Sequence, residues 1–260
     1  MTRVLSGVAL AAGAFALIWF LPTVYLLAVA LAVAALAFFE FAALAKGVGA
    51  PLPVWPSLAA TLAACAAVAL PWVHVPSLLG VIVVALAVSL ITSGRDGTPL
   101  VHGAAAGVLA PVYIGLPLGA LVGIHQVAGR EGVLTLIAAV AASDTFQYYA
   151  GRNFGKRPLA PVISPKKTIE GAIGGFLLAP LTLVLIAHWW LPRLNPLAVW
   201  VAGLGMVLAG IAGDLFESSF KRAAGVKDSG HLIPGHGGVL DRIDALLFCA
   251  PLFYLLVTLA

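Results

Sequence analysis

Carboxylate and basic side chains gather near the end of a chain that is otherwise poor in charge. In a helix, Asp214, Glu217 or Ser218, and Lys221 are three or four residues apart, so they share one face. Asp241 and Asp244 are likewise three residues apart, at the start of the last apolar segment. Carboxylates that converge in a low dielectric cannot all stay ionised unless a cation joins them. This stretch therefore indicates cation-assisted chemistry.

The ligand types in this stretch favour Mg²⁺. Hard oxygen donors without cysteine or neighbouring histidine bind Mg²⁺, which also keeps water and takes up substrate phosphates. The loop between the two acidic segments is rich in glycine, and Gly237 and Gly238 leave backbone N–H groups open to a phosphate. The basic residues around the acids are Lys221, Arg222, Lys227 and Arg242. Together these features indicate phosphoryl or nucleotidyl transfer.

A second polar cluster occupies residues 143–171. Thr168 is placed to cap the next helix, with Glu170 in its first turn. Lysines just before this cap lie where nucleotide phosphates or anionic head groups approach. The residues of this cluster that we expect to bind substrate are Asp144, Asn153, Lys166 and Lys167.

The composition predicts the elements that must position these residues. Of 260 residues, 62% are hydrophobic and 9% are charged, whereas a soluble domain is about 45–50% apolar and about 25% charged. The apolar runs are continuous, which argues against a β-barrel. We therefore expect an all-α, polytopic integral membrane protein with about nine transmembrane helices. The expected spans are 4–21, 24–45, 57–73, 76–93, 101–124, 132–150, 169–191, 196–217 and 239–259.

The chain divides by chemistry rather than by linkers. Pro22 separates the first two spans, because one helix through both would be about 63 Å long, twice a bilayer core. Residues 1–130 carry a single acid within their spans, Glu40, which we expect to pair with Lys46 near the interface. We interpret 1–130 as scaffold helices and 131–260 as catalytic helices and cytoplasmic loops of one continuous membrane domain.

Basic residues predict the orientation. With the N-terminus in the cytoplasm, nine spans leave only Arg130 and Arg193 outside, and the other Lys and Arg residues lie inside. The C-terminus is then outside and the acids lie at the cytoplasmic edge. The basic residues that give the net charge of +4 lie mainly in these inner loops, so the charge does not indicate a nucleic-acid-binding protein. Cys65 and Cys249 lie in apolar runs without ligand spacing, so we expect neither a disulfide nor a zinc site.

The stretch 218–244 resembles the signature of the phosphatidate cytidylyltransferase family, also called CDP-diacylglycerol synthases. It agrees at every specified position, and 143–171 is also similar to that family, whereas the N-terminal half agrees only in character. The matching residues are Ser218, Phe220, Lys221, Arg222, Lys227, Asp228, Gly230, Ile233, Pro234, His236, Gly237, Gly238, Val239, Asp241, Arg242, Ile243 and Asp244.

The resemblance implies that CTP and phosphatidate condense to CDP-diacylglycerol and pyrophosphate, in phospholipid biosynthesis at the inner (plasma) membrane. It also implies Mg²⁺ dependence, with a second, monovalent cation left open, and a homodimer. By position, Asp214 and Asp241 match the acids that hold the metal. The implied catalytic residues are Asp214, Lys221, Asp241 and Asp244. Those implied to bind substrate, besides the 143–171 cluster, are Ser218, Arg222, Lys227, Asp228, His236, Gly237, Gly238 and Arg242.

Three other functions remain open at this point. A CTP-dependent kinase of a membrane alcohol needs similar acids and a similar basic rim, but it transfers the γ-phosphoryl group. A cation-coupled secondary transporter also uses intramembrane acids, although it places them near the bilayer midplane. A nonenzymatic membrane scaffold leaves the polar clusters unexplained.

Overall fold

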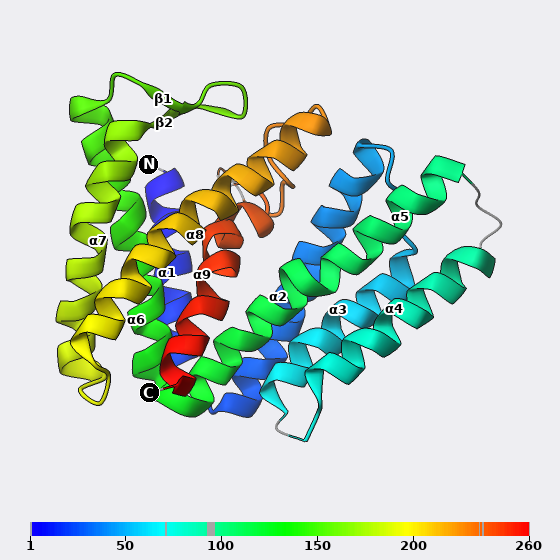
Figure 1. The fold of residues 1–260 in the computed structure, drawn as a ribbon, viewed down its shortest axis with the longest axis horizontal. Coiled ribbons are helices and arrows are strands. Elements are labelled where there is room, and N and C mark those ends of the chain that lie inside the picture. Colours follow the sequence, from blue (N-terminus) through cyan, green and yellow to red (C-terminus); the bar gives the residue numbers. More distant parts are fainter. Residues whose placement is uncertain (1, 71, 93–96, 234, 236, 260) are drawn as a thin grey trace. The chain divides into compact units, whose positions relative to one another are not determined.

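The computed structural model describes residues 2–70, 72–92, 97–233, 235 and 237–259, and it is mainly helical (Figure 1). This confirms the expected all-α character. A two-stranded antiparallel hairpin, which the sequence analysis treated as loop, is the one difference in class within these residues. The elements are α1 (Thr2–Phe20), α2 (Thr23–Gly47), α3 (Val54–Ala69), α4 (Val75–Thr92), α5 (Gly97–Ala110), the π-helix η1 (Pro111–Gly115), α6 (Leu116–Phe154), β1 (Pro158–Ala160), β2 (Ser164–Thr168), α7 (Ile169–Trp190), α8 (Pro196–Ala223) and α9 (Leu240–Leu259).

Several of these helices have the length and hydropathy of membrane spans, so the chain is an integral membrane protein. Within the described residues there are six such segments, and the count of nine is not confirmed. One reason is that Leu100–Phe154 is a single helical stretch of 55 residues. It bends at Gly129, where φ is 69°, between the fifth and sixth expected spans. The predicted break at Pro22 is confirmed, since α1 ends at Phe20 and α2 begins at Thr23.

The chain folds into two compact units. Unit 1 contains Met1–Gly123 and Phe220–Ile243, and unit 2 contains Ile124–Ser219 and Asp244–Ala260. The loop between α8 and α9, residues 224–239, is called the signature loop below. It belongs to the same unit as the N-terminal helices. The expected division at residue 130 separates scaffold helices from catalytic helices and loops. It is a division by function and stays a prediction.

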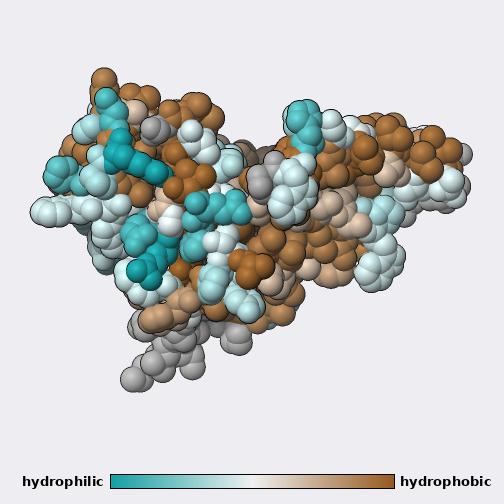
Figure 2. All heavy atoms as spheres, turned by 90° about the horizontal axis from the view of Figure 1, so that it is seen from below, coloured by the Kyte–Doolittle hydropathy of each residue, from teal (hydrophilic) through white to brown (hydrophobic). Residues whose placement is uncertain are grey.

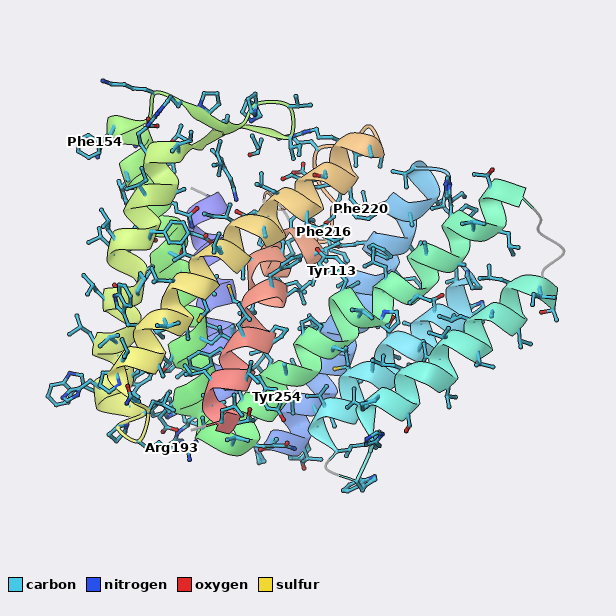
Figure 3. All side chains as sticks on the ribbon, in the orientation of Figure 1. Tyr113, Phe154, Arg193, Phe216, Phe220 and Tyr254 are labelled. Carbon is cyan, nitrogen blue, oxygen red and sulfur yellow. The ribbon has the colours of Figure 1, made fainter. Side chains whose placement is uncertain are left out.

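In unit 1, aromatic packing fixes the end of α8. The Phe41 ring on α2 lies 5.7 Å from the ring of Phe220 and 6.0 Å from that of Tyr113, between centroids. Figure 3 labels Phe220 and Tyr113. Phe41 is buried, and burying an aromatic side chain is strongly stabilising. This contact holds the backbone that carries the neighbouring Lys221.

In unit 2, α7 lies beside α6 and α8 (Figure 1). Buried Ala172 and Ala179 of α7 pack with Val207 and Ile211 of α8. The helices α8 and α9 approach closely at Gly213, where an added Cβ would lie 2.6 Å from the carbonyl oxygen of Asp244. Small residues permit such close helix contact in membranes.

Much of the protein surface is apolar. Figure 2 shows hydrophobic residues over large parts of one face, with hydrophilic residues confined to limited patches. Large side chains such as Leu177, Leu185 and Trp189 on α7 are well exposed. Exposed apolar patches of this size mark a surface that contacts lipid or protein rather than water.

Candidate functional site

A pocket of about 460 Å³ in unit 2 brings together four residues that the sequence analysis assigned to the site. It lies among α6, the hairpin, α7 and α8. Charged groups of both signs face it, as expected of a site that binds a polyphosphate next to a cation. Its polar lining consists of Asp144, Gln147, Tyr148, Arg152, Lys166, Lys167, Thr168 and Asp214.

The hairpin presents the lysines of this pocket. Strand β1 pairs antiparallel with β2, and β2 contains both Lys166 and Lys167. The predicted cap is confirmed, because the Thr168 hydroxyl accepts a hydrogen bond from the N–H of Gly171 at 3.1 Å. Thus the hairpin leads directly into α7, and the lysines sit just before the helix start.

Glu170 anchors the other side of the hairpin. One of its carboxylate oxygens accepts hydrogen bonds from the backbone N–H groups of Lys156 and Arg157, at 3.0 and 3.2 Å. The other oxygen accepts from Arg157 Nε at 3.1 Å. The acid in the first turn of α7 therefore does more than balance the helix dipole, because it ties the start of the hairpin to the helix.

Asp214 lies close to charged groups of both signs. Lys167 Nζ donates a hydrogen bond to Asp214 Oδ2. Asp214 and Glu217 both lie close enough to Asp244 to act on its carboxyl group electrostatically. The tight α8–α9 approach at Gly213 explains why these acids meet. Carboxyl groups this close repel each other unless a proton or a cation stands between them.

The donor set in unit 2 fits Mg²⁺. Within the residues that the structure describes, no three His, Cys, Asp or Glu side chains are arranged to hold a metal by themselves. Mg²⁺ does not require this, since it usually binds one or two carboxylates and completes its shell with water and substrate phosphates. Asp214 with Asp244 supplies such a pair. The pairing of Asp214 with Asp241 stays a prediction, because the two residues belong to different units.

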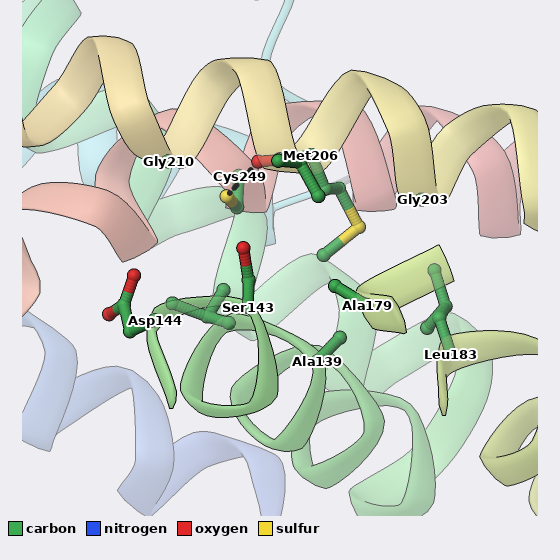
Figure 4. A pocket seen from close by; sticks show the side chains of 11 residues that line it. Ala139, Ser143, Asp144, Ala179, Leu183, Gly203, Met206, Gly210 and Cys249 are labelled. Atoms are coloured by element: carbon green, nitrogen blue, oxygen red, sulfur yellow. Dashed lines mark hydrogen bonds between the residues drawn. The ribbon is translucent and has the colours of Figure 1, made fainter. Parts of the chain in front are cut away.

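A small cavity lies beside Asp144 (Figure 4). Its walls include Ser143 and Cys249, and Cys249 Sγ donates a weak hydrogen bond to the carbonyl oxygen of Met206 at 3.2 Å. Both Cys249 and Cys65 are buried free thiols, which confirms that they form no disulfide. They behave as small apolar residues.

In unit 1, Asp241 is enclosed by donors. Lys221 Nζ donates to Oδ1 at 2.6 Å. Oδ2 accepts from Ser229 N–H at 2.9 Å, from the Ser229 hydroxyl at 2.9 Å and from Gly238 N–H at 2.8 Å. The side chains of Lys221 and Asp241 are only 12% and 5% exposed, so this is a buried ion pair. Removing one member of such a pair costs about 3–5 kcal/mol.

The expectation that Glu40 pairs with Lys46 is wrong. Glu40 is buried, with 6% exposure, and it reaches the signature loop instead. It accepts hydrogen bonds from the Ser229 hydroxyl at 3.0 Å and from the N–H groups of Val239 and Leu240 at 2.9 and 2.8 Å. The side chain therefore points toward the loop that precedes α9, while Lys46 is exposed.

The other predicted site residues are more exposed. Gly237 adopts φ 81° and lies against Asp241, where an added Cβ would be 2.6 Å from Oδ2. Arg222 donates to the carbonyl oxygen of Val226 at 3.3 Å, and Ser218 is half-buried. His236, like Pro234, lies outside the described residues. The exposed members are Asn153, Arg222, Lys227, Asp228 and Arg242; their roles stay predictions.

Glu40, Ser229 and Glu170 make site contacts that the sequence analysis did not assign to them. A signal for Glu40 was present, because a lone acid within apolar spans is costly and therefore usually functional. Ser229 occupies an unspecified position of the signature, so nothing in the pattern marks it.

Comparison with known proteins adds the decisive observation. A family model described as the cytidylyltransferase family matches residues 1–260. The chain belongs to the cytidylyltransferase family. It is 37% identical over 193 residues to the phosphatidate cytidylyltransferase of Staphylococcus aureus (strain COL), a match that covers 72% of each chain.

Two further relatives also bear the name phosphatidate cytidylyltransferase. The protein of Thermotoga maritima is 38% identical over 178 residues, which is 64% of this chain and 63% of the relative. That of Aquifex aeolicus is 43% identical over 125 residues, or 48% of this chain and 46% of the relative. This cytidylyltransferase family member therefore matches less than two thirds of the length of each of these two relatives.

Proposed function

We propose that this cytidylyltransferase family member condenses CTP with phosphatidate to give CDP-diacylglycerol and pyrophosphate. The pocket that places Lys166 and Lys167 beside Asp144 and Asp214 is the observation that carries the proposal. A cytidylyl donor and a lipid phosphate are both anionic, and lysines next to carboxylates that can hold a cation suit both. The names of the relatives indicate the same pair of substrates.

The chemistry needs no strong base, because the phosphate of phosphatidate already carries an anionic oxygen. That oxygen attacks the α-phosphorus of CTP in line and forms a new P–O bond. The bond from the α-phosphorus to the bridging oxygen breaks, and pyrophosphate leaves with that electron pair. Catalysis is then mostly positioning and charge neutralisation.

The chain's own residues divide these tasks. Lys166 and Lys167 hold the anionic groups in the pocket, and Lys221, Arg222 and Lys227 add positive charge along the signature. Asp214, with Asp244 beside it, would hold Mg²⁺, and Asp241 is the second ligand that the resemblance implies. When bound, Mg²⁺ neutralises charge on the transferred and leaving phosphates.

The proposal also includes a location. CTP is aqueous and the acyl chains of phosphatidate stay in lipid, so a site at the cytoplasmic edge of the inner membrane serves both substrates. The orientation with the N-terminus inside and the C-terminus outside is supported by the distribution of Lys and Arg. A homodimer is implied by the family resemblance.

The test uses the purified full chain in detergent with CTP, phosphatidate and MgCl₂, followed by lipid extraction and mass spectrometry. We expect a lipid with the mass of CDP-diacylglycerol that requires all three additions. A phosphorylated alcohol formed from added polyprenol would indicate the kinase instead. Uptake of an ion into vesicles without any new lipid would indicate the transporter. Either result without CDP-diacylglycerol contradicts the proposal.

Replacing Glu170 with Gln is expected to weaken CTP binding more than turnover. The neutral amide loses the charge that strengthens the bonds to the hairpin, so the strand that carries Lys166 and Lys167 is held less firmly. We therefore expect KM for CTP to rise by about tenfold with kcat nearly unchanged, as measured by initial rates. Glu131→Gln is the matched control, since Glu131 pairs with Arg130 at 36% exposure. An equal rise in that control, or no rise in Glu170→Gln, contradicts the anchoring role.

A further inference from the structure

Glu40 joins α2 to a loop almost two hundred residues later in the chain. One oxygen, Oε1, accepts from Val239 N–H, and the other, Oε2, accepts from Leu240 N–H and the Ser229 hydroxyl. Carboxylates bury only at a high cost, and hydrogen bonds from three donors offset part of it. A buried acid with such partners on a distant loop has a specific structural task.

The two N–H groups belong to the start of α9. The first N–H groups of a helix have no partner inside the helix, and a carboxylate placed there also interacts favourably with the helix dipole. This part is usually played by a local side chain. Here α2 supplies it from outside, so Glu40 fixes the start of the helix whose second residue is Asp241.

Two glycines of the signature make room for Glu40. A Cβ at Gly230 would lie 2.6 Å from Glu40 Oε1, and one at Gly238 would overlap Glu40 Oε2. Neither position has space for a larger residue while the carboxylate stays where it is. The absence of a side chain at these two positions therefore leaves space for the Glu40 carboxylate. This reason for glycine is separate from any contact with substrate.

Ser229 links Glu40 to Asp241. Its hydroxyl lies 3.0 Å from Glu40 Oε2 and 2.9 Å from Asp241 Oδ2, so the two carboxylates share its single O–H donor. A carboxylate has about four acceptor sites on its two oxygens. The donors Ser229 and Gly238 all engage Oδ2, which leaves Oδ1, the oxygen bound to Lys221, as the one with a remaining acceptor site.

We infer that Glu40 is a positioning residue for the reaction, acting through Ser229 and the start of α9 on Asp241. It keeps Oδ2 turned into the protein, so that Oδ1 and Lys221 are presented together. The inference rests on the proposed function for its kinetic effect, whereas its effect on the loop does not depend on the reaction.

The variants Glu40→Gln and Ser229→Ala test this role. Gln places an NH₂ donor against an N–H donor of α9, and Ala removes the bridging hydroxyl alone. We expect kcat to fall by about 10²-fold in each, since small misplacement costs about that much, with KM for CTP within about threefold. Because the two act through one connection, the double variant should lose little more than the worse single variant.

Hydrogen exchange measured by mass spectrometry gives a readout without substrate or metal. Peptides covering residues 229–241 should exchange faster in Glu40→Gln than in the wild type, while peptides from α7 stay unchanged. Glu131→Gln, the same chemical change at a half-buried acid outside this loop, should alter neither exchange nor kcat. Ser229→Ala serves as the test if Glu40→Gln fails to fold.

The outcomes separate the two proposals. Unchanged exchange in the loop, wild-type kcat in a folded variant, or fully additive losses would each overturn the positioning role. Absence of CDP-diacylglycerol from the wild-type protein, together with faster exchange in Glu40→Gln, would contradict the proposed reaction and leave the link from Glu40 to the loop standing.

Discussion

Replacing Asp214 with Asn is expected to reduce formation of CDP-diacylglycerol by about 10³-fold or more, the upper range for losing one electrostatic group in an active site. Asp214 faces the pocket, accepts a hydrogen bond from Lys167 and lies close to the carboxyl group of Asp244. Asn keeps the shape but removes the charge that a cation requires. Initial rates at saturating CTP, phosphatidate and MgCl₂ measure the effect.

The same variant should remain folded. The side chains of Asp214 and Lys167 are 26% and 23% exposed, so water reaches the Lys167 ammonium group and screens its charge in the variant. We expect normal membrane insertion and a melting temperature close to that of the wild type. Lys46→Ala is the control, because Lys46 is exposed and distant in sequence from both clusters, and it should keep its activity. Unchanged turnover in purified Asp214→Asn would defeat the metal assignment, and a similar loss in Lys46→Ala would mean that loop charges act generally.

Replacing Asp241 with Asn is expected to abolish activity and also to destabilise the protein. The amide removes the negative charge that accepts the bond from Lys221 Nζ, and it cannot accept all the bonds that Ser229, Gly238 and Lys221 now donate. The cost of breaking a buried pair is about 3–5 kcal/mol. Thermal unfolding in detergent and initial rates measure the two effects.

A second variant separates stability from chemistry at this pair. In Asp241→Asn combined with Lys221→Met, both charges of the buried pair are removed together, so much of the stability should return. Activity should stay lost, since both groups belong to the proposed catalytic set. A double variant that regains activity would show that the pair is purely structural. Equal thermal stability of Asp241→Asn and the wild type would contradict the buried pairing.

The sequence predicted most of what depends on local pattern. Pro22 separated α1 from α2 as expected, because proline cannot continue a helix without losing a hydrogen bond. Thr168 caps α7, as its type and position indicated. One pocket contains Lys166 and Lys167 together with Asp144 and Asp214. The sequence indicated these residues one by one, but helix spacing alone could not predict that residues on different elements meet.

What the sequence missed depends on contacts between distant segments. The position of Glu40 beside Lys46 favoured a local pair, and only the fold brings it to Val239 and Leu240. The hairpin was missed because its strands are short and β2 is Ser-Pro-Lys-Lys-Thr, which lacks the apolar alternation of a strand. The count of nine spans is not confirmed within the described residues, where Leu100–Phe154 runs through the expected fifth and sixth spans as one helical stretch with a kink at Gly129, and Val54–Ala69 is shorter than a full span.

Two parallel reactions, with CTP labelled at the α-phosphate or at the γ-phosphate, test cytidylyl transfer most directly. Each contains the purified protein, phosphatidate and MgCl₂, and is followed by lipid extraction. We predict that the α-label appears in the lipid and that the γ-label appears in pyrophosphate in equal amount. Label from the γ-phosphate in the lipid, with CDP released, or no label in the lipid from either nucleotide, would contradict cytidylyl transfer.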